Sequence, residues 1–230
     1  MIFSSHKKIA VIVAGGKGLR MNQPLPKQFV NIGGKPILMH TVEAFANYGV
    51  DEIILVLPKD HIDYWKNLCF DHNFSIKHKI IEGGFARFNS VKNALDAISE
   101  NEGFVAIHDG VRPFVSNNII NNSFNTALQK NSAVTSVKLK DSIRELTVTG
   151  ITKNVNRNNY YLVQTPQTFN LSLIKQAYNA ANHDNFTDDA SVFEEAGHQI
   201  HLIEGDYNNI KITTPEDLIF AEALLNAKIR

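Results

Sequence analysis

The stretch that most constrains the fold covers residues 9–27 and reads IAVIVAGGKGLRMNQPLPK. It begins with a short apolar run, which is typical of a strand buried within a parallel sheet. A glycine-rich turn follows at once, and Arg20 and Lys27 place positive charges just beyond it. A strand that runs into such a turn, with exposed backbone N–H groups and nearby cations, is suited to binding a polyphosphate. A tight turn without any ligand is the alternative, and the cations together with the stiffening Pro24 and Pro26 disfavour it.

Two familiar phosphate-binding motifs do not match this turn. A Walker A loop ends in Gly-Lys followed by Ser or Thr, whereas Lys17 is followed by Gly18. The dinucleotide motif G-x-G-x-x-G, started at Gly16, would require its third glycine at Met21. The turn therefore predicts a phosphate site that belongs to neither of these classes.

Strand-like and helix-like segments alternate along the chain. β-rich runs occur at residues 52–57, 76–81, 104–107 and 133–138, and helical segments separate them. This alternation predicts an α/β fold with a doubly wound, mostly parallel sheet of the Rossmann-like kind. A length of 230 residues suits one domain, which we expect to cover residues 1–230. Toward the C-terminus we expect short strands at residues 200–203 and 210–212, and a helix capped by Thr187.

The charges of the chain balance, with 23 basic and 23 acidic residues. A chain without net charge has no general attraction to nucleic acid or to an anionic membrane, so we expect neither as a partner. Cys69 is the only cysteine, which excludes an intrachain disulfide and a cysteine-based metal cluster. The apolar run after Lys7 and Lys8 is too short for a signal peptide or a membrane span, and we therefore expect a cytoplasmic protein.

A second glycine turn, Gly83 and Gly84, follows the run at residues 76–81 and precedes a helical segment that includes Ser90. The two glycines could serve only the turn, or they could let a planar base lie against the backbone. The local sequence supports both interpretations equally.

The strand predicted at residues 104–107 leads directly into Asp109 and Arg112. Ligand sites of open α/β sheets form beyond the carboxyl ends of the strands. A carboxylate in this place is suited to Mg²⁺, which takes oxygen ligands and usually keeps waters and substrate phosphates. A structural ion pair between Asp109 and Arg112 is the alternative, which is weaker because the strand directs Asp109 toward the edge that carries the first glycine turn.

Residues 140–164 depart from the α/β pattern. Polar and apolar residues alternate around Gly150, which predicts a β-hairpin with strands at residues 143–148 and 151–155. Such a hairpin has few partners within a parallel sheet, so an arm that reaches a second subunit is one expectation.

Taken together, these segments resemble the methylerythritol-phosphate cytidylyltransferases of isoprenoid precursor synthesis. The resemblance extends from about Ile9 to Glu222 and rests on the order and spacing of AGGKGLRM with PKQ, GG with NSV, HDGVRP, DS with NRN, TPQTF, FTDDAS and NIKITTPEDL. It implies transfer of a cytidylyl group from CTP to 2-C-methyl-D-erythritol 4-phosphate, giving 4-diphosphocytidyl-2-C-methyl-D-erythritol and pyrophosphate, with Mg²⁺ as cofactor. Cytidylyltransferases that use ribitol 5-phosphate or another sugar phosphate share most of these motifs and are the alternative.

The resemblance also implies roles for residues at matching positions. The residues with implied catalytic roles are Arg20, Lys27, Arg157 and Lys211. The residues with implied contacts to CTP are Ala14, Gly15, Gly16, Gly83, Gly84 and Ser90. Those implied to bind the acceptor are Arg112, Ser142, Thr165 and Thr187, and Asp109 is the implied ligand of Mg²⁺. The family further implies a homodimer formed through the arm at residues 140–164, with Arg157 serving the neighbouring subunit's site.

Asn156 and Asn209 depart from the pattern that the resemblance implies. They stand where we expect many members to have the aspartate of D-R-N and of D-N-I-K. These departures affect the acceptor side of the expected site and leave the CTP side unchanged.

Overall fold

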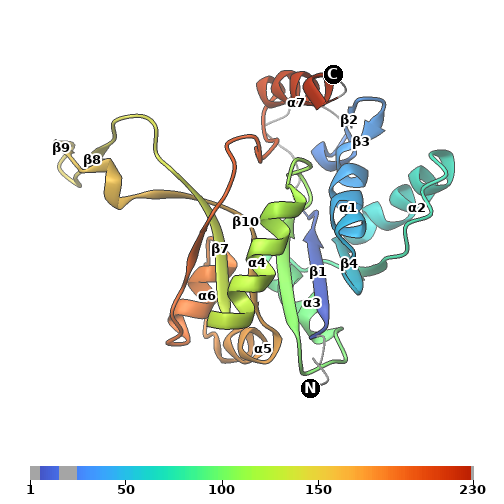
Figure 1. Ribbon diagram of the computed structural model, residues 1–230, viewed down its shortest axis with the longest axis horizontal. Helices are drawn as coiled ribbons and strands as arrows, with labels where there is room; N and C mark the ends of the chain where they lie inside the picture. The colour runs from blue at the N-terminus through green and yellow to red at the C-terminus, as the bar shows by residue number, and fades with distance from the viewer. Residues whose placement is uncertain (1–5, 16–24, 229–230) are drawn as a thin grey trace.

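The structure, a computed structural model, describes residues 6–15 and 25–228. It is built on a seven-stranded sheet with the spatial order β11-β7-β10-β6-β1-β4-β5 (Figure 1). In that order the strands cover Leu202–Glu204, Ser132–Lys138, Tyr161–Asn170, Phe104–Asp109, Lys8–Val13, Glu52–Leu57 and Lys79–Glu82. The strands expected at residues 9–13, 52–57, 104–107 and 133–138 are all confirmed.

The sheet is mostly parallel, as the alternation of strands and helices predicts. β1 pairs in parallel with both β4 and β6, and β4 pairs in parallel with β5. β10 lies antiparallel between β6 and β7, and β11 is parallel to β7 at the edge. The chain leaves β1 for β4 on one side and later returns for β6 on the other side. The end of β1 is therefore a topological switch point, where doubly wound sheets bind ligands.

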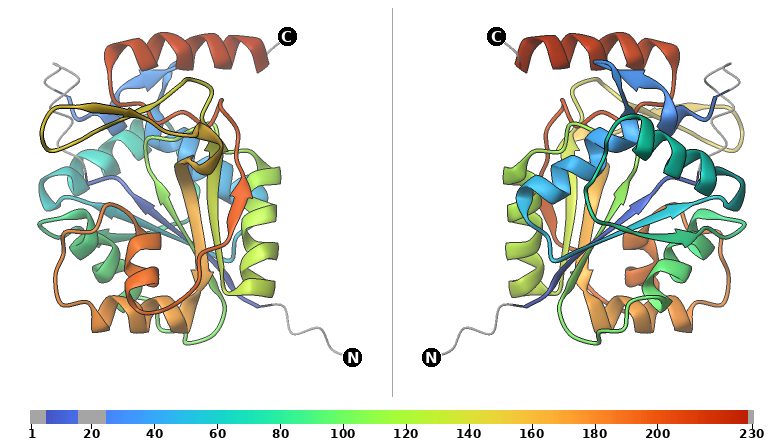
Figure 2. Two further views of the ribbon diagram at one scale, coloured as in Figure 1. Left: turned by 90° about the vertical axis from the view of Figure 1, so that its left-hand side faces the viewer. Right: turned by 90° about the vertical axis from the view of Figure 1, so that its right-hand side faces the viewer.

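Helices cover both faces of this sheet (Figure 2). One face packs against α1 (Ile37–Tyr48), α2 (Ile62–Asp71) and α4 (Asn117–Lys130), and the other against α3 (Arg87–Asp96), α5 (Leu171–Ala180) and α6 (Asp189–Glu195). None of the described helices is long and apolar enough to span a membrane.

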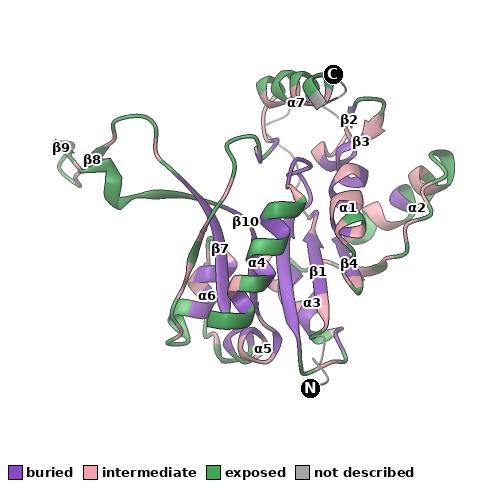
Figure 3. Ribbon diagram, in the orientation of Figure 1, coloured by how far each residue is buried: buried purple, intermediate pink, exposed green. Residues whose placement is uncertain are grey.

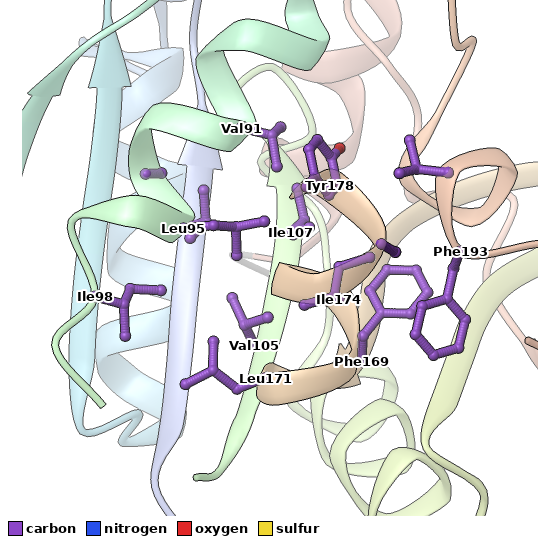
Figure 4. Close-up of a cluster of buried hydrophobic side chains, with 14 of the residues drawn as sticks. Val91, Leu95, Ile98, Val105, Ile107, Phe169, Leu171, Ile174, Tyr178 and Phe193 are labelled. Atoms are coloured by element: carbon purple, nitrogen blue, oxygen red, sulfur yellow. The ribbon is translucent and has the colours of Figure 1, made fainter. Parts of the chain in front are cut away.

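Successive residues of β1 alternate between the two faces. Ile9 and Val11 join the cluster under α3, whereas Ala10 and Ile12 join the cluster under α1. Figure 4 shows the first of these clusters, in which side chains of α3, α5 and β6 meet. Burial on both faces explains why β1 reads as a continuous apolar run.

Several expectations about element ends need correction. The cap of α6 is Asp188, whose side chain accepts a hydrogen bond from the Ser191 N–H, so Thr187 lies one residue before the cap. Residues 210–212 form no strand and lead into α7 (Pro215–Lys228). The strand expected at residues 76–81 begins only at Lys79.

α7 holds the segment before it against the strand ends. It packs over the loop that contains β2 (Asn31–Ile32) and β3 (Lys35–Pro36), where the Gly33 N–H donates to Glu222 Oε1 at 2.9 Å. Ile32, Val111 and Ile212 form a small separate core with Ala221 of α7. This core fixes the segment around Lys211 beside the carboxyl edge of the sheet.

The arm, residues 140–164, leaves the sheet after β7 and returns to it in β10 (Figure 1). It contains the antiparallel pair β8 (Arg144–Leu146) and β9 (Thr152–Asn154), with Gly150 at a φ of 80° in the turn. Figure 3 shows that the hairpin is exposed almost throughout, and its Leu146, Val148 and Ile151 side chains are 71%, 107% and 68% exposed. The expected hairpin is confirmed, with shorter strands than the sequence predicts.

Candidate active site

The carboxyl ends of β1 and β6 lie side by side. Val13, the last residue of β1, pairs in register with Asp109, the last residue of β6. The Gly110 N–H donates to the Val13 carbonyl at 2.8 Å, and the Ala14 N–H donates to the Val56 carbonyl of β4 at 3.0 Å. The expectation that Asp109 and the first glycine turn share one edge of the sheet is confirmed by this register.

A pocket of about 200 Å³, which we call the first pocket, opens at this edge. The lining residues that the sequence assigns to CTP, Mg²⁺ or catalysis are Ala14, Gly15, Lys27, Gly84, Ser90, Asp109 and Lys211. The remaining lining residues are Val13, Gln28, Phe85, Ala86, Arg87 and Val111. Gly83 is not in the lining, and its N–H donates to the Leu57 carbonyl at 2.8 Å. Gly16 and Arg20 lie outside the described residues.

Hydrogen bonds and close packing fix the walls of the first pocket. Ser90 Oγ accepts from the Gly84 N–H at 3.1 Å and donates to the Ala86 carbonyl at 3.0 Å. The buried Gln28 donates through Nε2 to the carbonyl of Ala14 at 2.9 Å. Gly84 has a packing reason to be glycine, because a Cβ there would lie 2.4 Å from the Cβ of Asn89. The turn therefore requires this glycine whether or not a base lies against it.

A second pocket, of about 280 Å³, adjoins the first. It is lined by Arg87, Asp109, Arg112, Val163, Gln164, Thr165, Gln167, Thr187, Asp188 and Lys211. The structure thus brings together Arg112, Thr165 and Thr187, three of the four residues that the sequence assigns to acceptor binding. The Asp109 N–H donates to Thr165 Oγ1 at 3.0 Å, which joins β6 to β10 where the pockets meet. The residues that line both pockets are Arg87, Asp109 and Lys211.

Asp109 is surrounded by three cations. Its Oδ2 lies 2.9 Å from Lys211 Nζ and 3.2 Å from Arg112 Nε, and its Oδ1 lies 4.0 Å from Arg87 Nε. Burial opposes ionisation of this carboxyl, but Lys211, Arg87 and Arg112 outweigh that effect and hold its pKa well below the usual range. The ion pair with Arg112 that the sequence allows is present, and it shares its carboxylate with Lys211. Arg87 is itself paired with Asp189, so Arg112 and Lys211 share the single carboxylate of Asp109 and leave an excess of one positive charge around it, which suits a phosphate group.

Ser142 and Arg157 lie on the arm and line neither pocket. Both residues are exposed, and Arg157 Nη1 donates to the carbonyl of Lys140 within the arm. Within the described part of one chain, the set of residues that the sequence assigns to the acceptor is therefore split between the second pocket and the arm.

Asn209 is fully buried and ties three segments together. Its Nδ2 donates to the Thr165 carbonyl at 2.9 Å and to Gln164 Oε1 at 3.2 Å, and its own carbonyl accepts from Arg112 Nη1 at 2.8 Å. A carboxylate could donate to neither of these oxygens, so these two buried hydrogen bonds require the amide. Matching N-N-I-K to D-N-I-K letter by letter places the aspartate of the motif at Asn208, so the expectation that Asn209 replaces it is wrong.

Sequence reasoning missed Arg87, Gln28 and Gln167. Gln167 Nε2 donates to Asp188 Oδ2 at 2.9 Å and its Oε1 accepts from the Ala190 N–H at 2.8 Å, so it joins β10 to the start of α6. Arg87 follows the second glycine turn in GGFAR, and a cation behind such a turn is the signal that could identify it. The two glutamines carry no comparable signal, because their partners lie far away in the sequence.

Asp109 is the residue that could hold Mg²⁺. Among the described residues, no group of three or more His, Cys, Asp or Glu side chains could form a metal site. A single carboxylate still fits Mg²⁺, which binds through one or two carboxylates together with substrate phosphates and waters. Oδ1 is the oxygen suited to this role, because Oδ2 already accepts hydrogen bonds from Arg112 and is paired with Lys211.

A doubly wound sheet with two adjoining pockets at its switch point, lined by a glycine turn and by lysine and arginine side chains, is typical of α/β proteins that bind nucleotides. The profile of the IspD family, described as 2-C-methyl-D-erythritol 4-phosphate cytidylyltransferase, matches residues 8–227. The 2-C-methyl-D-erythritol 4-phosphate cytidylyltransferase of Bacteroides thetaiotaomicron is 50% identical over 220 residues, which cover 95% of this chain and 100% of the relative.

Solved structures agree with this match. The 4-diphosphocytidyl-2C-methyl-D-erythritol synthase from Anaerococcus prevotii superposes with a TM-score of 0.83 at 32% identity, covering 96% of each chain. The 2-C-methyl-D-erythritol 4-phosphate cytidylyltransferase from Thermus thermophilus has a TM-score of 0.75 at 28% identity and covers 94% of this chain and 98% of its own. This chain belongs to the 2-C-methyl-D-erythritol 4-phosphate cytidylyltransferase family, and the resemblance expected from its motifs is confirmed.

Proposed function

We propose that the first pocket binds CTP and that the second pocket holds the phosphate of 2-C-methyl-D-erythritol 4-phosphate. The reaction is the transfer of a cytidylyl group from CTP to this acceptor in isoprenoid precursor synthesis, as family membership supports. The observation that carries the assignment is that both pockets share Arg87, Asp109 and Lys211. Two phosphate ligands seated in these pockets would meet over one carboxylate and its cations.

The reaction is a displacement at phosphorus. An oxygen of the acceptor phosphate bonds to the α-phosphorus of CTP, and the bond from that phosphorus to the bridging oxygen breaks, so pyrophosphate leaves with the electron pair. The second pKa of a phosphate monoester lies near 6, so the attacking oxygen is ionised at neutral pH and needs no strong general base. Catalysis therefore depends on positioning and on stabilisation of the negative charge that develops.

On the CTP side, the backbone of residues 14–16 and the cations Arg20 and Lys27 would hold the triphosphate. Gly83, Gly84 and Ser90 would bind the cytosine and ribose, because residues 84–86 and Ser90 line the first pocket and Gly83 directly precedes them. Phe85 is fully exposed beside the first pocket, which leaves its ring free to cover a bound base.

Mg²⁺, held by Asp109 and the phosphates of CTP, would neutralise charge on the triphosphate. Asp109→Asn should raise the Mg²⁺ concentration needed for half-maximal activity; superimposable Mg²⁺ curves would leave Asp109 with only its ion pairs.

On the acceptor side, Arg112, Thr165 and Thr187 would hold the phosphate, and Lys211 would contact both substrates. We place Ser142 and Arg157 at the acceptor through dimerisation, with the arm at residues 140–164 reaching the neighbouring subunit. The exposure of the hairpin and the position of Arg157 outside both pockets support this arrangement. We also propose a cytoplasmic location, which agrees with a chain that has a single cysteine.

The direct test is release of pyrophosphate from CTP with 2-C-methyl-D-erythritol 4-phosphate and, in parallel, with ribitol 5-phosphate. We expect a kcat/KM at least about a hundredfold higher for methylerythritol phosphate, the scale on which a polar site discriminates between hydroxyl patterns. A preference for ribitol 5-phosphate would overturn the acceptor assignment while preserving the CTP pocket. Absence of pyrophosphate release with both acceptors would overturn the assignment of both pockets.

A further inference from the structure

Arg87 stands out because it lines both pockets and has no role in the reaction as described so far. It is the first residue of α3 and directly follows the 83–86 turn of the first pocket. Of the other two residues that line both pockets, Asp109 is assigned to Mg²⁺ and Lys211 to both substrates, and the two form an ion pair. A cation in this position borders both proposed substrate sites.

The guanidinium of Arg87 is held in one orientation by Asp189. Nη1 donates to Oδ1 at 2.8 Å and Nη2 donates to Oδ2 at 2.6 Å, which is the parallel two-bond geometry that an arginine forms with a carboxylate. Tyr178 adds a third hydrogen bond, from its hydroxyl to Asp189 Oδ1 at 2.7 Å. Asp189 is completely buried, whereas the Arg87 side chain is 27% exposed, so the carboxylate end of the pair is shielded from water. With both terminal nitrogens engaged, the remaining Nε edge of Arg87 lies 4.0 Å from Asp109 Oδ1.

Asp189 in turn fixes the segment that lines the second pocket. It is the first residue of α6, and the two residues before it, Thr187 and Asp188, belong to the lining of that pocket. Gln167 of β10 holds the same turn from the other side, through Asp188 and the Ala190 N–H. The Thr187–Asp188 segment is therefore anchored to the sheet by Gln167 and to the start of α3 by Arg87.

The stacking of aromatic rings makes this connection stiff. Phe88, one residue after Arg87, stacks on Tyr178 with ring centroids 4.7 Å apart, and it also stacks on Phe186 at 5.5 Å. Figure 4 shows Tyr178 within the packed cluster that α3 and α5 share. Burial alone would lower the pKa of Arg87, but the charge of Asp189 outweighs it and raises that pKa, so the guanidinium stays charged.

We infer that the Arg87–Asp189 ion pair positions the second pocket against the first, so that the acceptor phosphate lies in line with the α-phosphorus of CTP. This inference rests on the proposed assignment of CTP and acceptor to the two pockets. Asp189 is a positioning residue in this arrangement, because it acts only through Arg87 and through the segment that carries Thr187. Loss of its charge would leave Arg87 without a buried partner and with Asp109 as the nearest carboxylate, 4.0 Å away.

The test compares Asp189→Asn with a matched control. The asparagine keeps the shape of the side chain and can still accept a hydrogen bond from Tyr178, but it cannot form the two-bond pair with Arg87. We expect KM for methylerythritol phosphate to rise and kcat to fall, each by about tenfold, the scale of a small misplacement of reacting groups. KM for CTP should change less than about twofold, because the walls of the first pocket keep their own hydrogen bonds.

Val91→Ala is the matched control, because Val91 is fully buried on α3 in the same cluster and lines neither pocket. It should lower the melting temperature and leave both KM values unchanged. Tyr178→Phe is the milder variant to use if Asp189→Asn does not fold, since it removes one hydrogen bond to Asp189 and keeps the ion pair. It should raise KM for the acceptor by about two- to fivefold, the low end of the scale for loss of one hydrogen bond, because the ion pair itself remains.

Thr187→Val separates a failure of this inference from a failure of the pocket assignment. If Thr187→Val raises KM for the acceptor while Asp189→Asn and Tyr178→Phe change only the melting temperature, as Val91→Ala does, the ion pair is merely structural and the inference is overturned. If Thr187→Val leaves KM for the acceptor unchanged, the second pocket is not the acceptor site, and the inference fails together with that assignment.

Discussion

Lys27 lines the first pocket, and the backbone on both sides of it is held in place by the fold. It opens the short helix η2 (Lys27–Phe29) behind Pro26, whose φ of −55° and ψ of 134° end the preceding loop in an extended conformation. The next residue, Gln28, is buried and bonded to the Ala14 carbonyl. A rigid backbone thus directs the cation at residue 27 into the first pocket, where its charge is preorganised.

Lys27→Ala should lower kcat by roughly two to three powers of ten, the scale for loss of one preorganised charge donor. KM for CTP should change much less, because the benefit of the charge is concentrated in the transition state. The measurement is steady-state pyrophosphate release, with Lys59→Ala as control, since Lys59 is exposed and lines neither pocket. A kcat near that of the parent would contradict the catalytic role of Lys27.

His108, which lies beside the turn that carries Asp109 and Arg112, should make the free energy of unfolding depend on pH. Its Nε2 donates to the Arg112 carbonyl at 3.1 Å, while its Nδ1 is buried without a hydrogen-bond partner in the described structure. Burial therefore lowers the pKa of His108 from 6.5 to about 4. Between pH 6.5 and about 4, the imidazole of His108 therefore stays neutral in the folded protein.

The free energy of unfolding should accordingly carry a contribution from His108 that is complete above pH 6.5 and decreases as the pH falls toward about 4. Between these values the unfolded chain binds a proton that the folded chain does not bind, and the loss reaches roughly 3 kcal/mol. Urea unfolding as a function of pH measures this for the parent and for His108→Gln, which keeps a donor for the Arg112 carbonyl and does not titrate. His72→Gln, at an exposed position, is the control. Parallel pH profiles for the parent and His108→Gln would contradict the assignment.

At the scale of elements, the strands and turns that form the first pocket could be predicted because each signal is local. β1, β4 and β6 are short apolar runs, and the glycine turns and HDGVRP follow them without interruption. β10 could not be predicted in the same way. Its TPQTF segment contains polar side chains that find partners only across the fold, as Gln167 does with Asp188 and Thr168 does with Ser123 at 2.9 Å.

The same distinction applies to the site. Residues within contiguous motifs, such as Lys27, Asp109 and Lys211, were predictable from spacing and resemblance, and the structure brings them together. The Arg87–Asp189 pair spans 102 positions of the sequence, so neither partner identifies the other. Thr187 reaches the second pocket, but the cap belongs to Asp188, because two adjacent polar residues compete for the same start of α6.

The hairpin of the arm exposes the apolar residues Leu146, Val148 and Ile151, which a second subunit could bury. Val148→Asp should disrupt the proposed dimer, because a charge at the fully exposed tip of the hairpin affects no packing within one chain but opposes burial against another. Sedimentation velocity gives the mass, and pyrophosphate release should decline with the dimer fraction. Phe70→Asp, on an exposed apolar residue of α2, is the control and should leave the mass unchanged. A Val148→Asp variant with the mass of the parent would show that the hairpin tip makes no subunit contact.

At the scale of the whole molecule, the residues proposed to bind the substrates or act in catalysis are divided between the body and the arm. The body supplies both pockets at the carboxyl edge of one sheet, whereas Ser142 and Arg157 belong to the arm and line neither pocket. The arm projects from the body (Figure 1). An isologous dimer would let each chain complete the site of the other, since each subunit gives the contact that it receives. An active site assembled from the body of one subunit and the arm of the other is the central claim about this molecule.

Mixing two inactive variants, Lys27→Ala and Arg157→Ala, tests this claim most directly. After subunit exchange, one site of each mixed dimer has both defects, and the other combines an intact Lys27 with the partner subunit's Arg157. Random pairing makes about half of the dimers mixed, so about a quarter of the parental cytidylyl transfer from CTP to methylerythritol phosphate should return. Exchange is verified by native mass spectrometry of differently tagged variants. Mixed dimers that form in the expected proportion and remain inactive would contradict an active site shared between subunits.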